Sequence, residues 1–279
     1  MQLITTINKL HLEEVSFSIT TSKGVIRGVK VGSGHQLFIG FHGFANSARY
    51  MLPLAKALSD DSTFYAIDLP FHGETDWQHS HFNALDIAEV CQNIMKRENV
   101  SLFSIVGFSM GGRIGIKLLE VIPQSIDKLY LISPDGFGTR WIRHLEKLPF
   151  KFRLKLANWD KIDLTLLKFT KFLENTGAIN GLPHRFFKNH LNDVDRRARM
   201  FGSWVSLSHF SVKPRRLKKN LKRSGKEVLL VFDRNDPITS SKRAIKRMNR
   251  LKSYANLVQT DGGHKIAVDA ICPLIQQNK

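Results

Sequence analysis

Apolar segments of strand length alternate with amphipathic segments of helix length along most of this 279-residue chain. Residues 48–58 and 82–97 repeat apolar residues at helical spacing. Strands that alternate with helices form a mostly parallel sheet with helices on both faces. The sequence therefore predicts one large α/β domain with about eight strands. The strand-like segments are 14–20, 25–31, 36–41, 63–67, 102–106, 128–133, 226–232 and 255–259.

The alternation stops between residues 136 and 223, where no strand-like segment occurs. An apolar stripe at helical spacing stands there instead. We predict that 136–223 is a helical cap inserted after the sixth strand, and that residues 1–135 and 224–279 form the core. The stripe consists of Trp159, Ile162, Leu166, Phe169 and Leu173.

The net charge of +18 is concentrated in the predicted cap. Residues 140–223 carry 21 Lys and Arg and 6 Asp and Glu, whereas residues 1–139 carry 11 and 13. A solvated basic face over an apolar lining explains this excess. Contact with an anionic membrane surface and binding of an anionic substrate or partner are the alternatives. Nucleic acid is not an expected partner because no recognition motif accompanies the charge.

Targeting and redox signals are weak in this chain. No segment approaches the roughly 18 apolar residues of a membrane-spanning helix, and residues 1–6 lack the basic and apolar regions of a secretory signal. Cys91 and Cys272 lie far apart, without metal-ligand or redox spacing. These features predict a cytoplasmic protein with reduced thiols and no metal or organic cofactor.

Residues 107–111 read Gly-Phe-Ser-Met-Gly, between strand 102–106 and the helical stretch 113–121. A serine on a tight strand-to-helix turn exposes its hydroxyl, and flanking glycines remove the Cβ atoms that would clash there. The N–H groups at the start of the helix favour developing negative charge. Ser109 is therefore the predicted nucleophile. The pentapeptide alone leaves open a Gly-rich turn with a buried capping serine.

Three other turns with reactive side chains follow strands of the predicted sheet. His42-Gly43-Phe44 follows strand 36–41, Asp233 to Pro237 follows strand 226–232, and Asp261 to His264 follows strand 255–259. Functional groups in open α/β sheets gather at the carboxyl ends of strands. We therefore expect these turns to meet near Ser109. The resulting order along the chain is serine, aspartate, histidine.

The chain resembles the α/β-hydrolase superfamily over about residues 14–275. The resemblance implies an α/β-hydrolase fold, in which a mostly parallel eight-stranded sheet has helices on both faces and a helical lid follows strand 6. Five motifs carry the resemblance: H-G-F at 42–44, D-L-P-F-H-G-E-T at 68–75, G-F-S-M-G-G at 107–112, N-D-P-I at 235–238 and G-G-H at 262–264.

The resemblance also implies catalytic roles for individual residues. Ser109 would be the nucleophile, His264 the general base and Asp236 the carboxylate that orients the histidine. The backbone N–H groups of Phe44 and Met110 would form the oxyanion hole.

Several site assignments keep alternatives. Asp135, after the sixth strand, and Asp233 are rivals of Asp236 as the acid. The predicted substrate-binding residues are His42, Arg113 and Trp159. The family pattern also gives His42 and His72 a structural role, and it allows Arg113 to be a surface residue paired with an acid.

A serine nucleophile argues against the epoxide hydrolases and haloalkane dehalogenases of this fold, which use aspartate. The resemblance implies a serine hydrolase that cleaves a small or medium carboxylic ester or thioester. Residues 107–113, Gly-Phe-Ser-Met-Gly-Gly-Arg, also look like the menaquinone-pathway lyase that makes a cyclohexadiene carboxylate, although Phe108 departs from its pattern. A serine-triad lyase and a ligand-binding protein with little turnover are therefore the alternatives.

Overall fold

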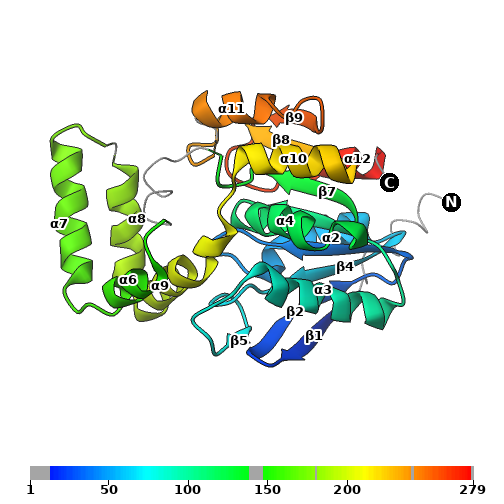
Figure 1. Ribbon diagram of the computed structural model, residues 1–279, viewed down its shortest axis with the longest axis horizontal. Coiled ribbons are helices and arrows are strands. Elements are labelled where there is room, and N and C mark those ends of the chain that lie inside the picture. Colours follow the sequence, from blue (N-terminus) through cyan, green and yellow to red (C-terminus); the bar gives the residue numbers. More distant parts are fainter. Residues whose placement is uncertain (1–12, 138–146, 180, 240–241, 278–279) are drawn as a thin grey trace.

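The computed structural model describes residues 13–137, 147–179, 181–239 and 242–277 (Figure 1). One mixed sheet has the strand order β1-β2-β4-β3-β6-β7-β8-β9, and β5 pairs with β2 outside this path. The strands are β1 (Glu14–Thr21), β2 (Gly24–Val31), β3 (Gln36–Phe41), β4 (Ser62–Ile67), β5 (Asp76–Trp77), β6 (Phe103–Phe108), β7 (Ile126–Ile132), β8 (Glu227–Asp233) and β9 (Asn256–Thr260).

This architecture confirms the predicted α/β-hydrolase fold with one difference in strand number. The sheet has nine strands, and the additional one is β5. Two residues are too few to show a periodic pattern, so β5 has no signal in the sequence. The pairs β1–β2, β2–β4 and β2–β5 are antiparallel, and from β4 to β9 all neighbours are parallel.

Helices cover both faces of the sheet, as the continuous apolar character of its central strands requires. The strands β4 and β6 are buried at every residue. One face packs against α3 (Ala84–Glu98), α4 (Met110–Val121), α10 (Pro214–Ser224) and α11 (Lys242–Asn249). The other face packs against a 3-10 turn (Ala48–Met51), α2 (Leu52–Leu58) and α12 (Val268–Gln277).

The helices α6 to α9 form a separate cap, which extends to the left in Figure 1. Its own apolar cluster includes Ile162, Phe187 and Phe201. By contrast, α10 packs on the core through Leu217 and Leu221, although all of it but the last residue falls inside the range 136–223. The cap helices are α6 (Phe150–Ala157), α7 (Ile162–Asn175), α8 (Leu182–Leu191) and α9 (Val194–Leu207).

The predicted stripe of the cap is only partly buried. Ile162 is buried, and Leu166 is half-buried. However, Trp159 lies before α7 with 45% of its surface exposed, and Phe169 is 57% exposed. Two members of the stripe thus lie largely at the surface.

Two kinds of feature are absent from the described part of the chain. No helix in it is long and apolar enough to cross a membrane. No group of three or more His, Cys, Asp or Glu side chains in it is arranged to hold a metal ion.

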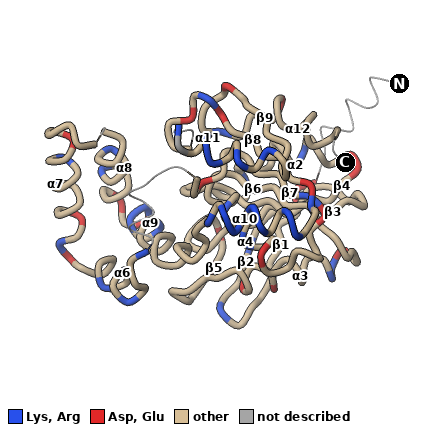
Figure 2. Tube along the Cα trace, turned by 45° about the horizontal axis from the view of Figure 1, so that its top comes forward, with Lys and Arg blue, Asp and Glu red and all other residues tan. Residues whose placement is uncertain are grey.

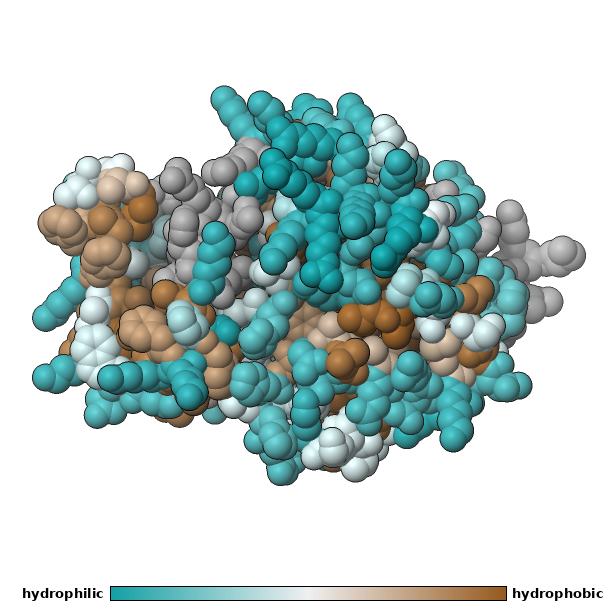
Figure 3. All heavy atoms as spheres, in the orientation of Figure 1, coloured by the Kyte–Doolittle hydropathy of each residue, from teal (hydrophilic) through white to brown (hydrophobic). Residues whose placement is uncertain are grey.

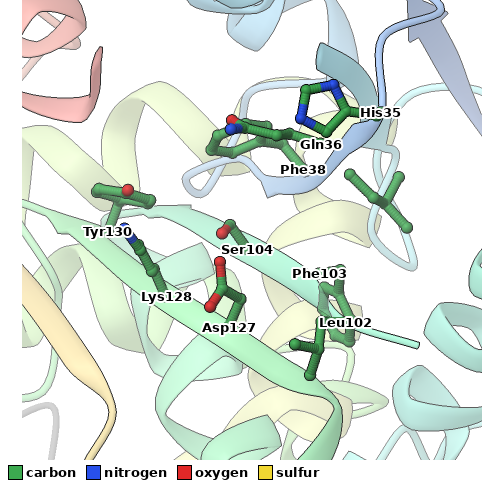
Figure 4. A pocket seen from close by; sticks show the side chains of 10 residues that line it. His35, Gln36, Phe38, Leu102, Phe103, Ser104, Asp127, Lys128 and Tyr130 are labelled. Carbon is green, nitrogen blue, oxygen red and sulfur yellow. The ribbon is translucent and has the colours of Figure 1, made fainter. Parts of the chain in front are cut away.

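A small hollow lies at the amino ends of β3, β6 and β7 (Figure 4). Its lining includes Gln36, Ser104, Asp127 and Tyr130, and its volume is about 180 Å³. Ser109 follows the carboxyl end of β6, so the hollow and the predicted site lie at opposite edges of the sheet.

Candidate active site

Ser109 occupies a strained turn between β6 and α4, with φ of 51° and ψ of −113°. A Cβ atom on Gly107 would lie 2.7 Å from the carbonyl oxygen of Gly111, and one on Gly111 would lie 2.0 Å from that of Phe41. The two glycines of the pentapeptide are therefore steric requirements of this turn. Strain of this kind persists where the surrounding structure enforces it, and here it places the serine at the end of the sheet.

Three side chains from distant parts of the chain form one hydrogen-bonded series. The Nε2 atom of His264 lies 3.0 Å from Oγ of Ser109. The Nδ1 atom of His264 lies 2.6 Å from Oδ2 of Asp236. Because an ionised carboxylate only accepts hydrogen bonds, Nδ1 carries the proton and Nε2 is free to accept from the serine hydroxyl. This tautomer is the one that a general base beside a serine needs.

Asp236 is held in place by the residues that follow it. Its Oδ1 atom accepts from the backbone N–H of Ile238 at 2.8 Å and from that of Thr239 at 3.0 Å, and its Oδ2 atom accepts from the Thr239 hydroxyl. Burial acts to raise the pKa of Asp236, but the hydrogen bonds from His264 and Thr239 outweigh burial and lower this pKa to about 2. The carboxylate is therefore ionised at neutral pH.

The two rival acids have other partners. Asp135 lies 3.4 Å from Nε of Arg113, measured from Oδ2, and its own N–H donates to the carbonyl of Ser109. Asp233 accepts from the nearby Asn235 N–H and from the Thr260 hydroxyl, and the second bond joins the end of β8 to β9. Asp236 is thus the carboxylate of the three that is bonded to His264.

The loop after β3 lies against the serine turn. A Cβ atom on Gly43 would be 3.2 Å from Cβ of Ser109 and 3.0 Å from the ring of Phe108. Phe44 follows directly, while Met110 is the first residue of α4, where a backbone N–H has no acceptor within its helix. The predicted oxyanion donors, Phe44 and Met110, are thus the residues that follow Gly43 and Ser109.

Two buried histidines shape the loop that carries Phe44. The Nδ1 atom of His42 donates to Gly43 O at 2.7 Å, and its Nε2 atom accepts from Leu69 N–H at 3.1 Å. His72 accepts from Ala45 N–H in the same way, at 3.2 Å. Burial lowers the pKa of His42 to about 4 and that of His72 to about 3. Both ring nitrogens of His42 are thus hydrogen-bonded to the main chain. This arrangement differs from the expectation that His42 binds substrate.

Asp68 is a structural residue that the sequence analysis missed. Its carboxylate accepts from Ala48 N–H at 2.6 Å and from Glu74 N–H at 3.0 Å. A Cβ atom on Gly73 would lie 2.0 Å from the carboxyl carbon of Asp68. The motif at 68–75 contains both residues, so the signal was present without an assigned role.

The remaining predicted substrate-binding residues are placed differently from each other. Arg113 is buried, only 8% exposed, and lies beside Asp135 rather than on the helix surface. Trp159 lies in the turn between α6 and α7. The structure brings two further cap residues to the site, because the rings of Phe186 and His190 lie 5.7 Å and 5.3 Å from that of Phe44. No spacing in the sequence relates residue 44 to these positions.

Residues 36–270 match the family model described as alpha/beta hydrolase fold. Among curated proteins, the chain is 29% identical over 113 residues to the dihydrolipoyllysine-residue acetyltransferase component of the acetoin cleaving system of Cupriavidus necator. This match covers 40% of the chain and 30% of that protein. A putative esterase/lipase of Haemophilus influenzae is 29% identical over 107 residues, which is 37% of each protein. The chain thus aligns with only about a third of the length of these relatives.

A solved structure of similar fold is 2-hydroxy-6-oxo-6-phenylhexa-2,4-dienoate hydrolase from Rhodococcus sp. strain RHA1. Its TM-score is 0.65 at 18% sequence identity, and the match covers 96% of this chain and 99% of that one. At this identity the likeness bears on the fold alone.

Proposed function

Because the chain belongs to the alpha/beta hydrolase fold family, we propose that it is a serine hydrolase that cleaves a carboxylic ester or thioester through an acyl-enzyme. The hydrogen-bonded series Ser109–His264–Asp236 is the observation that carries this proposal. The family match and the relative named as a putative esterase/lipase support hydrolase chemistry in general.

The proposed reaction has two stages. Nε2 of His264 takes the proton of the Ser109 hydroxyl while Oγ attacks the substrate carbonyl carbon, and the same proton then passes to the leaving alcohol or thiol. In the second stage His264 takes a proton from water while the water oxygen attacks the acyl carbon. His264 then returns this proton to Oγ of Ser109, and the acid is released. Asp236 holds the imidazole in position and stabilises its positive charge in both stages.

Negative charge on the carbonyl oxygen is stabilised in this proposal by the backbone N–H groups of Phe44 and Met110. One such donor is worth roughly 3 kcal/mol of barrier in enzymes of this kind. His42 and His72 contribute indirectly, since they hold the loop that orients the N–H of Phe44.

The proposed substrate has an apolar group beside the cap. Phe44 and Phe186 offer aromatic surface next to the site, and the His190 ring lies against that of Phe186 at a tilt of 30°, with ring centroids 4.3 Å apart. Direct substrate contacts of Arg113 and Trp159 stay predictions. So does a cytoplasmic location, which rests on the two buried free cysteines, Cys91 and Cys272.

The lyase alternative receives less support from the geometry. It requires Arg113 to bind a substrate carboxylate, and Asp135 already lies beside this guanidinium. The ligand-binding alternative predicts little or no turnover. The predicted contact of segment 136–223 with an anionic membrane is a separate proposal, because no family similarity bears on it.

The test is hydrolysis of p-nitrophenyl esters with acyl chains of two to sixteen carbons, together with acyl thioesters. We expect Ser109→Ala to reduce kcat by roughly 10⁵-fold or more. Ser104→Ala is the matched control, because Ser104 lies in the same strand as the turn but at its opposite end. Its rates should equal those of the wild type.

Equal rates for Ser109→Ala and the wild type would overturn the assignment of the nucleophile. Wild-type protein without activity on the whole series would overturn the hydrolase proposal. Carboxylated substrates of the lyase type would then be the next to assay.

A further inference from the structure

The cap helix α7 has two apolar sides, and the cap covers only one of them. Ile162 and Thr170 are buried. Leu164, Phe169 and Phe172 are 61%, 57% and 61% exposed, and these three residues define the apolar side of α7. A group of large exposed apolar side chains on one helix indicates a contact surface, since isolated ones need no explanation but a cluster does.

A dense group of exposed basic side chains lies on and after two helices of the core, α10 and α11. Helix α10 contains six Lys or Arg and no Asp or Glu, and all six basic side chains are exposed. Lys246, Arg250 and Lys252, on and after α11, are exposed as well. We call these nine residues the basic face (Figure 2). Its α10 members are Arg215, Arg216, Lys218, Lys219, Lys222 and Arg223.

Few acidic groups neutralise the basic face. Arg216 forms an ion pair with Glu120 at 3.2 Å, and Glu120 is also paired with Lys117. Lys218 lies over the ring of Tyr254, with Nζ 5.5 Å from the centroid, and this contact joins α10 to the segment after α11. The basic side chains of α10 and those on and after α11 therefore add to one positive field.

The cap helix α7 and the core helices α10 and α11 are visible from one direction. In the view shared by Figures 1 and 3, hydrophobic atoms gather over the cap at α7, and hydrophilic atoms cover α10 and α11. Lys168 and Lys171 are exposed between the apolar residues of α7. One side of the molecule thus combines hydrophobic surface over the cap with the two helices that carry the basic face.

A lipid surface with anionic headgroups matches both parts of this side. Basic residues near such a surface contribute about 1 kcal/mol each, and apolar side chains that enter the acyl boundary add binding that salt does not screen. A nucleic acid would match the charges but would leave Leu164, Phe169 and Phe172 without a partner. An acidic protein would need both an acidic patch and an apolar patch, separated by the same distance as the basic face and the apolar side of α7.

We propose that the apolar side of α7 and the basic face together form a docking surface for an anionic lipid membrane. The sequence placed this contact on segment 136–223 alone. In the structure the surface is divided, because α10 packs on the core and α7 belongs to the cap. The proposal goes beyond the hydrolase chemistry and does not depend on it.

The experiment is sedimentation with vesicles of phosphatidylcholine containing 30% phosphatidylglycerol, compared with pure phosphatidylcholine, at 50 mM and 500 mM salt. The Ser109→Ala protein is used, so the result is independent of turnover. We expect clear binding to the anionic vesicles at 50 mM salt and weaker binding to them at 500 mM salt. Binding to pure phosphatidylcholine should be only slightly above background.

Two variants separate the parts of the surface. Lys219→Gln with Lys222→Gln should reduce the partition coefficient at low salt by on the order of tenfold or more. Leu164→Ser with Phe172→Ser should remove the binding that remains at 500 mM salt. The matched controls are Lys56→Gln with Lys96→Gln, on α2 and α3, and Leu85→Ser, an exposed apolar residue of α3.

Circular dichroism and the thermal midpoint should be the same for all variants, so that changes in binding report on the surface. Absence of wild-type binding to the anionic vesicles at 50 mM salt would overturn the proposal. Equal losses in the control variants would overturn it as well. Retention by a DNA duplex but not by vesicles would assign the basic face to nucleic acid instead.

Discussion

The serine site and the cap differ in how many of their polar groups are hydrogen-bonded and in how many of their apolar side chains are buried. At the site, Asp68, His42 and His72 each bond to main-chain groups through both polar atoms. In the cap, helix α7 leaves three large apolar side chains exposed. Among the described residues, three of the buried side-chain atoms without a hydrogen-bond partner also lie in the cap, namely Asp163 Oδ1, Ser203 Oγ and Trp204 Nε1.

This difference indicates that the two regions meet different demands. A buried polar group without a partner costs about 1–3 kcal/mol, so the hydrogen bonds of Asp68, His42 and His72 fix the position of the loop more rigidly. The site needs such rigidity because its hydrogen bonds act only at defined distances. The cap satisfies fewer of its groups internally and presents more surface for contact with other molecules. Four changes test this comparison, from the largest expected effect to the smallest.

Asp236→Asn should lower kcat on an ester substrate by roughly 10⁴-fold, because an amide no longer favours the tautomer with the proton on Nδ1. Asp135→Asn should cost far less, since Asp135 lies beside Arg113. Steady-state kinetics of the two variants measure the contrast. Equal losses in the two variants would contradict the assignment of Asp236 as the carboxylate that orients His264.

Arg153→Leu should destabilise the cap by about 3 kcal/mol. The Arg153 guanidinium is buried and donates to the carbonyls of Trp204 and Val205. These hydrogen bonds join α6 to α9. Limited proteolysis should show faster cleavage within residues 147–207 while the core persists. Arg97→Leu, which removes one exposed hydrogen bond to Ser18, is the control. Simultaneous loss of cap and core would show that the two regions unfold as one unit.

His72→Asn should make stability less sensitive to acid. Burial lowers the pKa of His72 to about 3, below its ordinary value of 6.5. Protons therefore bind the unfolded chain first, and folding loses about 1.4 kcal/mol per pH unit from this group as pH falls below 6.5. Urea unfolding at pH 7.0 and 5.0 should show a loss smaller by about 2 kcal/mol in the variant. The exposed His79→Asn is the control, and an unchanged loss would contradict the burial of a neutral His72.

Met110→Leu should change kcat by less than about tenfold. The proposed oxyanion donor at this position is the backbone N–H, which the substitution retains. Rates on a short-chain ester measure the effect. A loss above a hundredfold would mean that the Met110 side chain itself shapes the site, and the contrast between a rigid site and an adaptable cap would then need revision.

The core elements were predictable because their signals are local. The predicted strand 36–41 coincides with β3, and helix 82–97 differs from α3 by two residues at its start and one at its end. Strand β5 was missed, since two residues carry no period. The sequence also does not show that α9 and α10 are two separate helices, because the basic residues around 196–223 obscure their apolar spacing.

Candidate site residues were predictable where a steric or positional rule acts within a few residues. Gly107 and Gly111 mark the turn at Ser109 because any Cβ atom there would clash. The choice between Asp236, Asp135 and Asp233 was different, since all three lie at or after the carboxyl ends of neighbouring strands. Only the positions of their partners distinguish them.

The sequence by itself determined the α/β alternation, the serine turn and the order of the reactive turns, because these depend on steric and periodic constraints between near neighbours. The tertiary structure alone decided which carboxylate meets His264, that Arg113 is buried, and that α10 belongs to the core. It also decided which side of α7 is covered. Such outcomes depend on contacts between residues far apart in the chain, such as Phe44 with Phe186, which no local pattern encodes.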